Sequence, residues 1–213
     1  MVESYEVFHR LFSAYDSWYS RNRSVWMSEC LCVRSLGISG AVLDIGVGTG
    51  AFRDCMNGYV VGVDPALNPL KLAAARGVDP VNGFGEALPF RSRSFDWATM
   101  IVTICFLSNP LAALEEARRV LRRGGYLAIC FVPRDSPWGE LYELRRAREE
   151  SVFYRFAKLY SHREVVELGE QAGFSYVETI ETLCSDPRAP QGVELPRRGF
   201  SGCGFACVKM RAL

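Results

Sequence analysis

The sequence has little of what marks membrane, secreted or nucleic-acid-binding proteins. Among its 213 residues no apolar run approaches the roughly 20 residues of a membrane span, and the first residues, MVESYEVFHR, lack the apolar core of a signal peptide. The net charge is +1 with both signs interspersed, which predicts no general attraction to nucleic acid or anionic membranes. Arg145, Arg146 and Arg148 are typical of a solvated helix face rather than of a phosphate track. We therefore expect a cytoplasmic protein without a membrane or nucleic-acid partner.

The eight cysteines contain no metal-like C-x-x-C pair. Two pairs lie close along the chain, Cys30 with Cys32 and Cys203 with Cys207, and neighbours on one strand do not easily form an unstrained disulfide. Most cysteines lie in apolar contexts, such as Cys130 in LAICFV. We therefore expect buried free thiols and no metal site.

What the sequence does contain is a buried strand followed by a glycine turn, AVLDIGVGTGAF at 41–52. The run before the turn is apolar except for Asp44, which is typical of a parallel strand buried on both faces. Gly46, Gly48 and Gly50 let the backbone turn sharply and point N–H groups at one ligand. We expect an anionic group there, facing the positive end of a helix that begins near Thr49.

The ligand of this turn is not decided by the glycines alone. Gly46, Gly48 and Ala51 also satisfy the dinucleotide pattern G-x-G-x-x-A. Asp44 would repel a pyrophosphate but would suit a ligand that carries an ammonium or sulfonium charge beside its carboxylate. This favours S-adenosylmethionine over a nicotinamide cofactor.

Several further motifs carry a family resemblance. The motif D-I-G-V-G-T-G at 44–50 and V-G-V-D at 61–64 look like those of class I S-adenosylmethionine-dependent methyltransferases. G-E-A-L-P-F at 85–90, S-F-D-W-A at 94–98 and A-R-R-V-L-R-R-G-G-Y-L at 117–127 resemble the subgroup with the ubiquinone and menaquinone methyltransferases. The resemblance implies one α/β domain over residues 1–213. Its expected fold is three-layered and Rossmann-like, with a seven-stranded, mostly parallel sheet, an antiparallel last strand and a helical cap.

Asp64 ends a second predicted strand at 59–63, directly before Pro65 and a helix predicted at 69–76. A carboxylate there can accept two hydrogen bonds from a ribose diol, and the alternative is a helix N-cap. Val81 marks a third strand. The family then places Glu86, Ala87 and Leu88 beside the adenine, although Phe84 stands where its pattern has an aspartate.

A long apolar strand is predicted from Phe95 to Leu107, and its end should face the reacting methyl group. Thr103 lies there and is assigned to the cofactor site. Related enzymes often carry a histidine at this end, and this chain has none. Cys105 is a conceivable nucleophile, but a cysteine in an apolar run is usually inert.

Two aromatic segments are candidates for the acceptor pocket. Residues 3–36 predict two helices with an aromatic stripe that either packs on the sheet or closes over the cofactor, and the family resemblance favours closure, with Tyr15 in the cofactor site. Residues 134–160 predict a helical insertion, with two helices, that forms the other pocket wall or packs on the N-terminal helices. No catalytic residue is assigned. If the acceptor must lose a proton, His9, Tyr15 and Asp16 are the candidates by position.

The remaining elements complete the predicted fold. A helix is expected at 110–122 with Gly124 and Gly125 as its stop, and strands at 126–132, 176–183 and 205–210. Ser161 and Glu164 form a predicted capping box for a helix that ends near Gly173, which gives His162 a structural explanation.

These observations predict methyl transfer from S-adenosylmethionine to a nitrogen, oxygen or carbon atom of a small molecule, by a monomer or homodimer. A non-catalytic S-adenosylmethionine-binding or scaffold protein shares every cofactor motif and is the main alternative. A nicotinamide-dependent oxidoreductase is a further alternative and is disfavoured by Asp44, which would repel the pyrophosphate of its cofactor.

Overall fold

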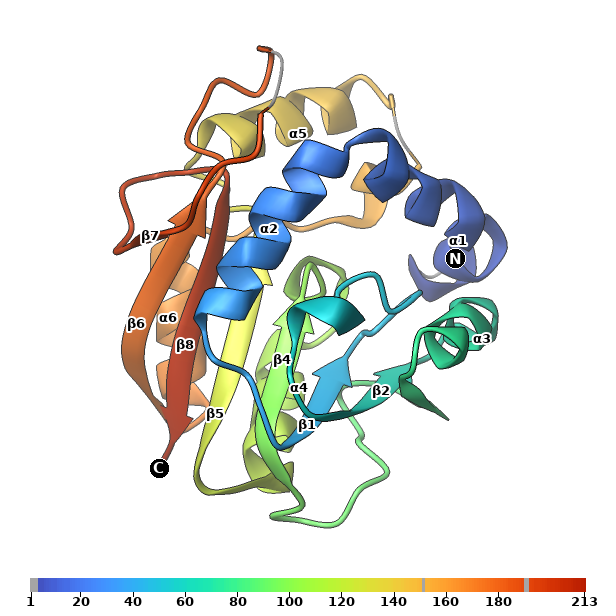
Figure 1. The fold of residues 1–213 in the computed structure, drawn as a ribbon, viewed down its shortest axis with the longest axis vertical. Helices are drawn as coiled ribbons and strands as arrows, with labels where there is room; N and C mark the ends of the chain where they lie inside the picture. Colours follow the sequence, from blue (N-terminus) through green and yellow to red (C-terminus); the bar gives the residue numbers. More distant parts are fainter. Residues whose placement is uncertain (1–3, 151, 190–191) are drawn as a thin grey trace.

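An eight-stranded sheet runs through the computed structural model, which describes residues 4–150, 152–189 and 192–213 (Figure 1). The strands follow the order β3-β2-β1-β4-β5-β8-β6-β7 across the sheet. Their bounds are β1 Ala41–Ile45, β2 Tyr59–Asp64, β3 Asp79–Asn82, β4 Phe95–Ile101, β5 Leu121–Phe131, β6 Phe174–Thr182, β7 Arg197–Arg198 and β8 Phe205–Ala212.

The first five strands pair in parallel, and β8 is inserted antiparallel between β5 and β6. This confirms the predicted mostly parallel sheet with an antiparallel last strand. The two-residue strand β7 adds an eighth strand to the seven expected, because Arg197 and Arg198 pair with the outer edge of β6. The order reverses between β1 and β4, and ligands of open α/β sheets bind at the carboxyl ends of strands at such a point.

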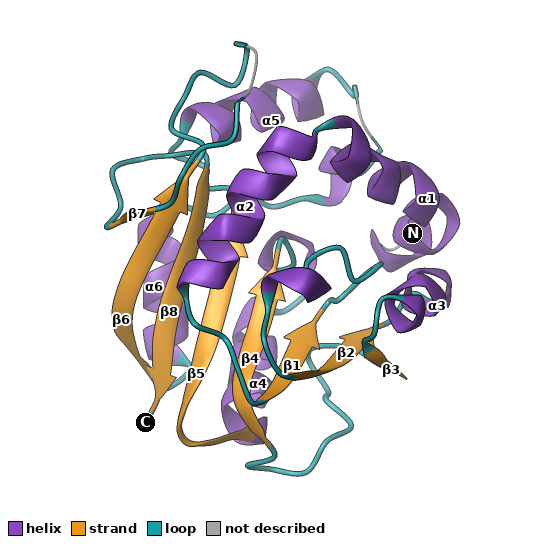
Figure 2. Cartoon of the chain, in the orientation of Figure 1, coloured by secondary structure: helices purple, strands orange, loops and turns teal. Residues whose placement is uncertain are grey.

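Helices lie on both faces of the sheet and above its carboxyl edge (Figure 2). The helix α2 crosses one face in front of β8, α4 and α6 lie behind the sheet, and α1 and α5 lie near the carboxyl ends of the strands. The α-helices are α1 Ser4–Arg21, α2 Arg23–Ser35, α3 Leu67–Ala75, α4 Pro110–Val120, α5 Pro137–Ala147 and α6 His162–Gln171; the short 3-10 helices are η1 Arg53–Cys55, η2 Ile104–Phe106 and η3 Tyr154–Phe156. None of the helices in these described ranges has the length and apolarity needed to cross a bilayer.

The strand β1 shows how the sheet separates two apolar layers. Val42 packs in the cluster on the α2 side, whereas Leu43 and Ile45 pack in the cluster that includes residues of α4 and α6. Because side chains alternate along a strand, Asp44 lies on the same side as Val42. The sequence therefore places one carboxylate on the α2 face, at the carboxyl end of a central strand.

The N-terminal helices agree with the prediction, except that Glu3, its first residue, lies outside the described residues. The helix α1 is kinked at Leu11, whose φ of −113° and ψ of 17° are not helical.

The capping box of Ser161 and Glu164 is confirmed at the start of α6, and Gly173 follows that helix with a positive φ.

Four local predictions were wrong. No α-helix follows the glycine turn, because turns and the three-residue η1 fill the short connection to β2. The strand β4 ends at Ile101 instead of Leu107, because Val102 turns into the left-handed region with a φ of 55°. Gly124 and Gly125 lie inside β5, which begins directly after α4. The insertion at 134–160 contains one α-helix and η3 instead of two helices, and its Ser151 lies outside the described residues.

The cysteine prediction was half right. Cys32, Cys105, Cys130 and Cys207 are free and buried, as expected. The other four form disulfides between residues distant in sequence, Cys30 with Cys55 and Cys184 with Cys203. Close spacing along the chain cannot reveal such pairs. They form because the fold brings α2 against η1 and the end of β6 against the start of β8.

Candidate active site

The glycine turn is fixed by hydrogen bonds to the neighbouring strand β2. The amide of Gly46 donates to the carbonyl of Val63 at 2.8 Å, and that of Gly48 donates to Oδ2 of Asp64 at 2.9 Å. Gly46 has a φ of 73°, and a Cβ there would lie 2.3 Å from Cγ2 of Thr103. The turn thus needs glycine at 46 both for its backbone conformation and for the close approach of the β4 end.

Gly50 has a different role from the other two glycines of the turn. A Cβ at Gly50 would lie 3.1 Å from Cα of Ala73 in α3, so this glycine lets the turn pack on that helix. It is not among the residues that line the cavity described below. With no α-helix after the turn, the expected helix dipole is also absent.

Asp64 is held rigidly at the end of β2. Its Oδ1 accepts from the amide of Ala66 at 2.8 Å and its Oδ2 accepts from that of Gly48, while the residue is 9% exposed. Burial raises its pKa, and the two amide bonds oppose that rise. Asp64 is not the N-cap of α3, a position that Ala66 occupies. Each carboxylate oxygen keeps a further lone pair for a hydroxyl donor in the cavity.

Asp44 is the second carboxylate beside the turn. It is buried, and its Oδ1 accepts from the hydroxyl of Thr99 at 2.7 Å on the adjacent strand β4. Burial raises the pKa of Asp44 to about 7, the Thr99 bond lowers it, and the nearby Asp64 raises it further. Because this pKa is close to neutral pH, a cation placed beside Asp44 would readily shift the carboxyl group to its ionised form.

The loop between β3 and β4 separates the three residues that the sequence grouped there. Glu86 lines the cavity, and its Oε1 accepts from the amides of Ser108 and Asn109 at 3.1 and 3.2 Å. The amide of Leu88 donates to Glu116 in α4 at 2.8 Å, and the Leu88 side chain is buried in the core. Neither Ala87 nor Leu88 is among the lining residues.

Phe84 lies in the same loop, at the position where the family pattern has an aspartate. It is 49% exposed, lines the cavity, and packs edge-on against Tyr5 of α1 with ring centroids 5.6 Å apart. A ring pair therefore stands on this side of the cavity in place of a carboxylate.

The end of β4 carries backbone strain. Val102 adopts a φ of 55°, which is unfavourable for a β-branched residue, and its amide donates to the carbonyl of Cys130 at 2.8 Å. The turn places Thr103 against the glycine turn, with its hydroxyl within hydrogen-bond distance of the carbonyl of Gly46. Burial raises the pKa of Cys105 to about 12, so this thiol is an inert core group rather than a nucleophile.

These elements enclose a cavity of about 1090 Å³, part of it open to solvent. It brings together Asp44, Gly46, Gly48, Asp64 and Pro65, and also Glu86, Thr103 and Tyr15, out of the eleven residues predicted for the site. The lining residues are Tyr5, Phe8, Phe12, Tyr15, Tyr19, Asp44 to Thr49, Ala51, Phe52, Asp64, Pro65, Pro69, Phe84 to Glu86, Ile101 to Thr103 and Phe106 to Ser108.

The helix α1 covers this cavity and is tied to the glycine turn. Asp16 accepts from both terminal nitrogens of Arg76, at 2.6 and 2.9 Å, and from the hydroxyl of Thr49 at 2.6 Å. Arg76 also donates to the carbonyl of Thr49 at 3.0 Å. We call these three residues the Asp16 latch. Sequence reasoning missed it, because residues 16, 49 and 76 are far apart and each alone reads as ordinary surface polarity.

None of the three candidate bases in α1 is prepared for that role. The ion pair with Arg76 lowers the pKa of Asp16, which makes it a poor proton acceptor. Burial raises the pKa of Tyr15, whose hydroxyl lies 3.2 Å from that of Tyr19. The ring of His9 lies 3.3 Å from the side-chain amide of Asn68, and His9 is not among the lining residues.

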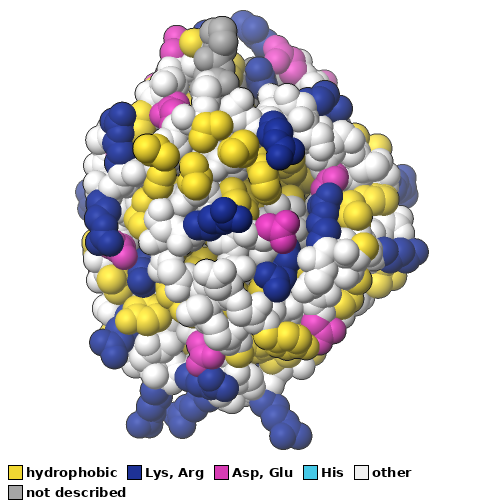
Figure 3. Space-filling model, viewed as in Figure 1, with side chains coloured by type: hydrophobic (Ala, Val, Ile, Leu, Met, Phe, Trp, Pro, Cys, Tyr) yellow, Lys and Arg dark blue, Asp and Glu magenta, His cyan; other side chains and the backbone are white. Residues whose placement is uncertain are grey.

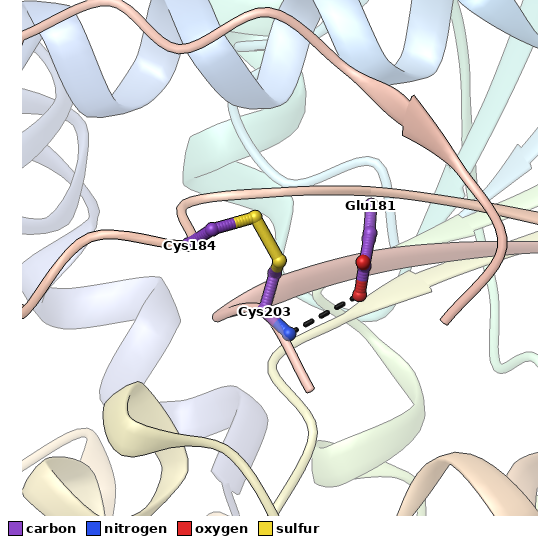
Figure 4. A group of neighbouring side chains, drawn as sticks. All are labelled: Glu181, Cys184 and Cys203. Carbon is purple, nitrogen blue, oxygen red and sulfur yellow. Dashed lines mark hydrogen bonds between the residues drawn. A yellow bond between two sulfur atoms is a disulfide. The ribbon is translucent and has the colours of Figure 1, made fainter. Parts of the chain in front are cut away.

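Another group of ligand-type side chains lies away from the cavity. Glu181, Cys184 and Cys203 have potential metal-ligand atoms within 4.8 Å of one another. Figure 4 shows that the two sulfurs are joined in the disulfide and that the amide of Cys203 donates to Glu181. Both carboxylate oxygens of Glu181 also accept from Ser201, at 2.9 and 2.5 Å. The group therefore fastens the segment before β8 to the end of β6.

Comparisons with known proteins agree with this geometry. Residues 43–129 match the family described as Methyltransferase domain. A Thermotoga maritima protein, described as a SAM-dependent methyltransferase and possible histamine N-methyltransferase, is 33% identical with a TM-score of 0.91, over 98% of this chain and 99% of that one. An uncharacterized protein of Methanocaldococcus jannaschii is 33% identical over 95% of this chain and 97% of its own. A demethylmenaquinone methyltransferase of Listeria monocytogenes is 28% identical over 82% of this chain and 90% of its own.

Proposed function

We propose a reaction for this chain, which belongs to the family of S-adenosylmethionine-dependent methyltransferases: it methylates a nucleophilic nitrogen, oxygen or carbon atom of a small molecule. The observation that carries this proposal is the cavity itself. Two buried carboxylates, Asp44 and Asp64, frame one glycine turn, and the aromatic residues of α1 close the cavity from above.

The residues of the cavity fit S-adenosylmethionine, the family's cofactor. Asp64 would hold the ribose hydroxyls and Asp44 would balance the positive charge of the methionine part. Gly48 leaves open space in the cavity, since a Cβ added there would meet no atom within 4 Å. Phe84 and Tyr5 would pack against the adenine ring. When bound, the cofactor supplies an electrophilic methyl group on a sulfonium that is already a good leaving group.

The protein's own contribution is positioning and exclusion of water. The rings of Phe8, Tyr15 and Phe106 pack edge-on, with Phe8 5.2 Å from Tyr15 and 4.9 Å from Phe106. They line the cavity with apolar surface. Holding two reactants in line in such a site can supply roughly 7 to 11 kcal/mol of rate acceleration. This accounts for the lack of a prepared base in α1, since an acceptor that is already nucleophilic needs none.

A small acceptor is supported by the surface as well as by the relatives. On the face in Figure 3, several Lys and Arg side chains gather at the left and lower edges of the view, and those in the middle lie among acidic, hydrophobic and uncharged groups. No continuous basic stripe of the kind that tracks a nucleic-acid backbone crosses this face. The relatives described as a possible histamine N-methyltransferase and as a demethylmenaquinone methyltransferase both carry names that refer to small molecules. We carry only that shared feature to this chain.

The test is equilibrium binding followed by turnover. Calorimetry should give micromolar affinity for S-adenosylmethionine and S-adenosylhomocysteine and no heat with NAD. The protein is then incubated with methyl-labelled cofactor and a panel of amines, phenols and quinols, and the products are examined by mass spectrometry. A labelled product supports the proposal. NAD binding without S-adenosylmethionine binding would contradict it, and cofactor binding without transfer to any acceptor would favour a scaffold protein.

A further inference from the structure

A second cavity adjoins the first and is lined mainly by aromatic and apolar residues. It encloses about 1130 Å³ of empty space, part of it open to solvent. The two cavities share Tyr15, Tyr19, Val102 and Phe106 as a common wall. The far side comes from α2, the end of β5, α5 and the segment around η3; these lining residues are Glu29, Phe131, Val132, Tyr142, Phe153, Tyr154, Ala157, Leu159 and Tyr160.

Glu29 is the unusual member of this lining. It lies on the apolar face of α2 together with Val25, Cys32 and Val33, and is only 5% exposed. Its Oε2 is fully buried and has no hydrogen-bond partner among the described residues. Burial raises the pKa of Glu29 to about 8. An unsatisfied buried carboxyl group destabilises a fold, so this oxygen is better explained by a ligand than by packing.

The surfaces around Glu29 suit a flat apolar molecule with one positive end. The rings of Tyr142 and Tyr154 stack with their centroids 4.7 Å apart, and Tyr15 and Tyr19 pack edge-on at 5.6 Å on the shared wall. Ring faces attract cations and enclose apolar groups. The one basic side chain among the lining residues is that of Arg21, and no salt bridge between it and Glu29 is found among the described residues.

We propose that the second cavity binds the methyl acceptor and that Glu29 accepts a hydrogen bond from a protonated basic nitrogen of that acceptor. This inference rests on the proposed methyl transfer. The nitrogen at Glu29 is an anchor and not the methylated atom, because a protonated nitrogen has no lone pair to attack a methyl group. The acceptor is therefore a largely apolar amine with a second nucleophilic atom, which reaches the shared wall.

The experiment uses three arylalkyl amines with their matched alcohols: benzylamine, 2-phenylethylamine and 3-phenylpropylamine, against benzyl alcohol, 2-phenylethanol and 3-phenylpropanol. Each is titrated into the full chain saturated with S-adenosylhomocysteine. The variants are Glu29→Gln, which keeps the volume, and Glu140→Gln, an exposed glutamate of α5, as the matched control. Circular dichroism and a melting curve check folding.

We expect at least one amine to bind the wild type at least tenfold more tightly than its alcohol. Glu29→Gln should remove that difference and Glu140→Gln should keep it. Equal affinities for amine and alcohol, an unchanged preference in Glu29→Gln, or no binding of any amine up to millimolar concentration would overturn the proposal. The wild-type comparison of amine with alcohol holds even if the variant fails to fold.

The titration with S-adenosylhomocysteine separates this inference from the proposed function. If the wild type did not bind S-adenosylhomocysteine but still bound the amine more tightly than its alcohol, methyl transfer would be contradicted and the Glu29 site would stand. If the wild type bound the cofactor but showed no preference for the amine, the Glu29 site would be overturned and methyl transfer would stand.

Discussion

The two cavities share a wall but are built by different means. In the first, backbone hydrogen bonds hold the main residues in place: the amides of Gly48 and Ala66 fix Asp64, and the bond to the carbonyl of Val63 fixes Gly46. In the second, the lining residues are mainly aromatic and apolar, and Glu29 has an oxygen without a partner among the described residues. A site made from backbone geometry demands particular residues at fixed spacing. A site made from side chains can change its ligand through single substitutions, without disturbing the sheet.

Gly46→Ala is the substitution from which we expect the largest effect on the first cavity. The new methyl group would lie 2.3 Å from Cγ2 of Thr103, and residue 46 has a φ of 73°. We expect a loss of about 3 kcal/mol of folding free energy, from backbone strain and overpacking together, and loss of cofactor binding. Urea unfolding and calorimetry measure the two effects.

Gly37→Ala is the matched control, because Gly37 has the same φ of 73° and a Cβ added there would have no atom within 4 Å. It should lose only the strain, about 1 kcal/mol, and keep cofactor affinity. Equal destabilisation by the two substitutions would contradict the close packing of Gly46 against Thr103.

The disulfides give a second test. Removing either the 25-residue link of Cys30 to Cys55 or the 19-residue link of Cys184 to Cys203 should cost about 3 kcal/mol by the loop-entropy estimate. The first bond joins α2, which carries Glu29, to the connection after the glycine turn; the second lies away from both cavities. Serine variants of Cys55 and Cys203 should therefore melt at similarly lowered temperatures, and only Cys55→Ser should weaken cofactor binding. Similar cofactor affinities in both variants would show that the link does not support the site.

Asp64→Ala tests the ribose assignment. The variant loses the acceptor for hydroxyl groups and leaves the amides of Gly48 and Ala66 without their partner, so affinity for S-adenosylmethionine should fall by about 2 to 3 kcal/mol. Asp79→Asn on the neighbouring strand β3, where the residue is exposed, is the control. An unchanged dissociation constant for Asp64→Ala would remove the residue from the site.

The smallest expected effect is a pH dependence of cofactor affinity. With its pKa near 7, Asp44 is mostly protonated at pH 6 and mostly ionised at pH 8. The sulfonium charge favours the ionised form, so the dissociation constant of S-adenosylmethionine should rise about tenfold as the pH falls from 8 to 6. Calorimetry across this range measures the change. Asp44→Asn should flatten this component, and a slope unchanged in that variant would assign the dependence to another group.

The sequence predicted the first cavity far better than the second. The run from Ala41 to Gly50 encodes a buried strand and a turn whose spacing few folds use, and Asp64 follows at the end of the next strand. Both predictions depend on local chain geometry. The missing helix after the turn could also have been anticipated, because only eight residues separate Gly50 from Tyr59 and one of them is Gly58.

The rest depends on tertiary contacts that no local pattern contains. The disulfide of Cys30 with Cys55 and the Asp16 latch each join segments distant in sequence. Val102 adopts a left-handed conformation that its own side chain disfavours, which is why the predicted strand was too long. Glu29 did leave a signal, since it shares the spacing of Val25 and Val33 on an otherwise apolar helix face.

The kink at Leu11 has a consequence for how a ligand could leave. It divides α1 into a first part that carries Tyr5 and Phe8 over the cofactor cavity and a second part that the Asp16 latch pins to the glycine turn. Each turnover must exchange a large cofactor product, while the shape of the acceptor cavity should stay constant. We expect the exit to open at the first part of α1 alone, while the tyrosines of the shared wall, which lie in the second part, keep their places between one reaction and the next.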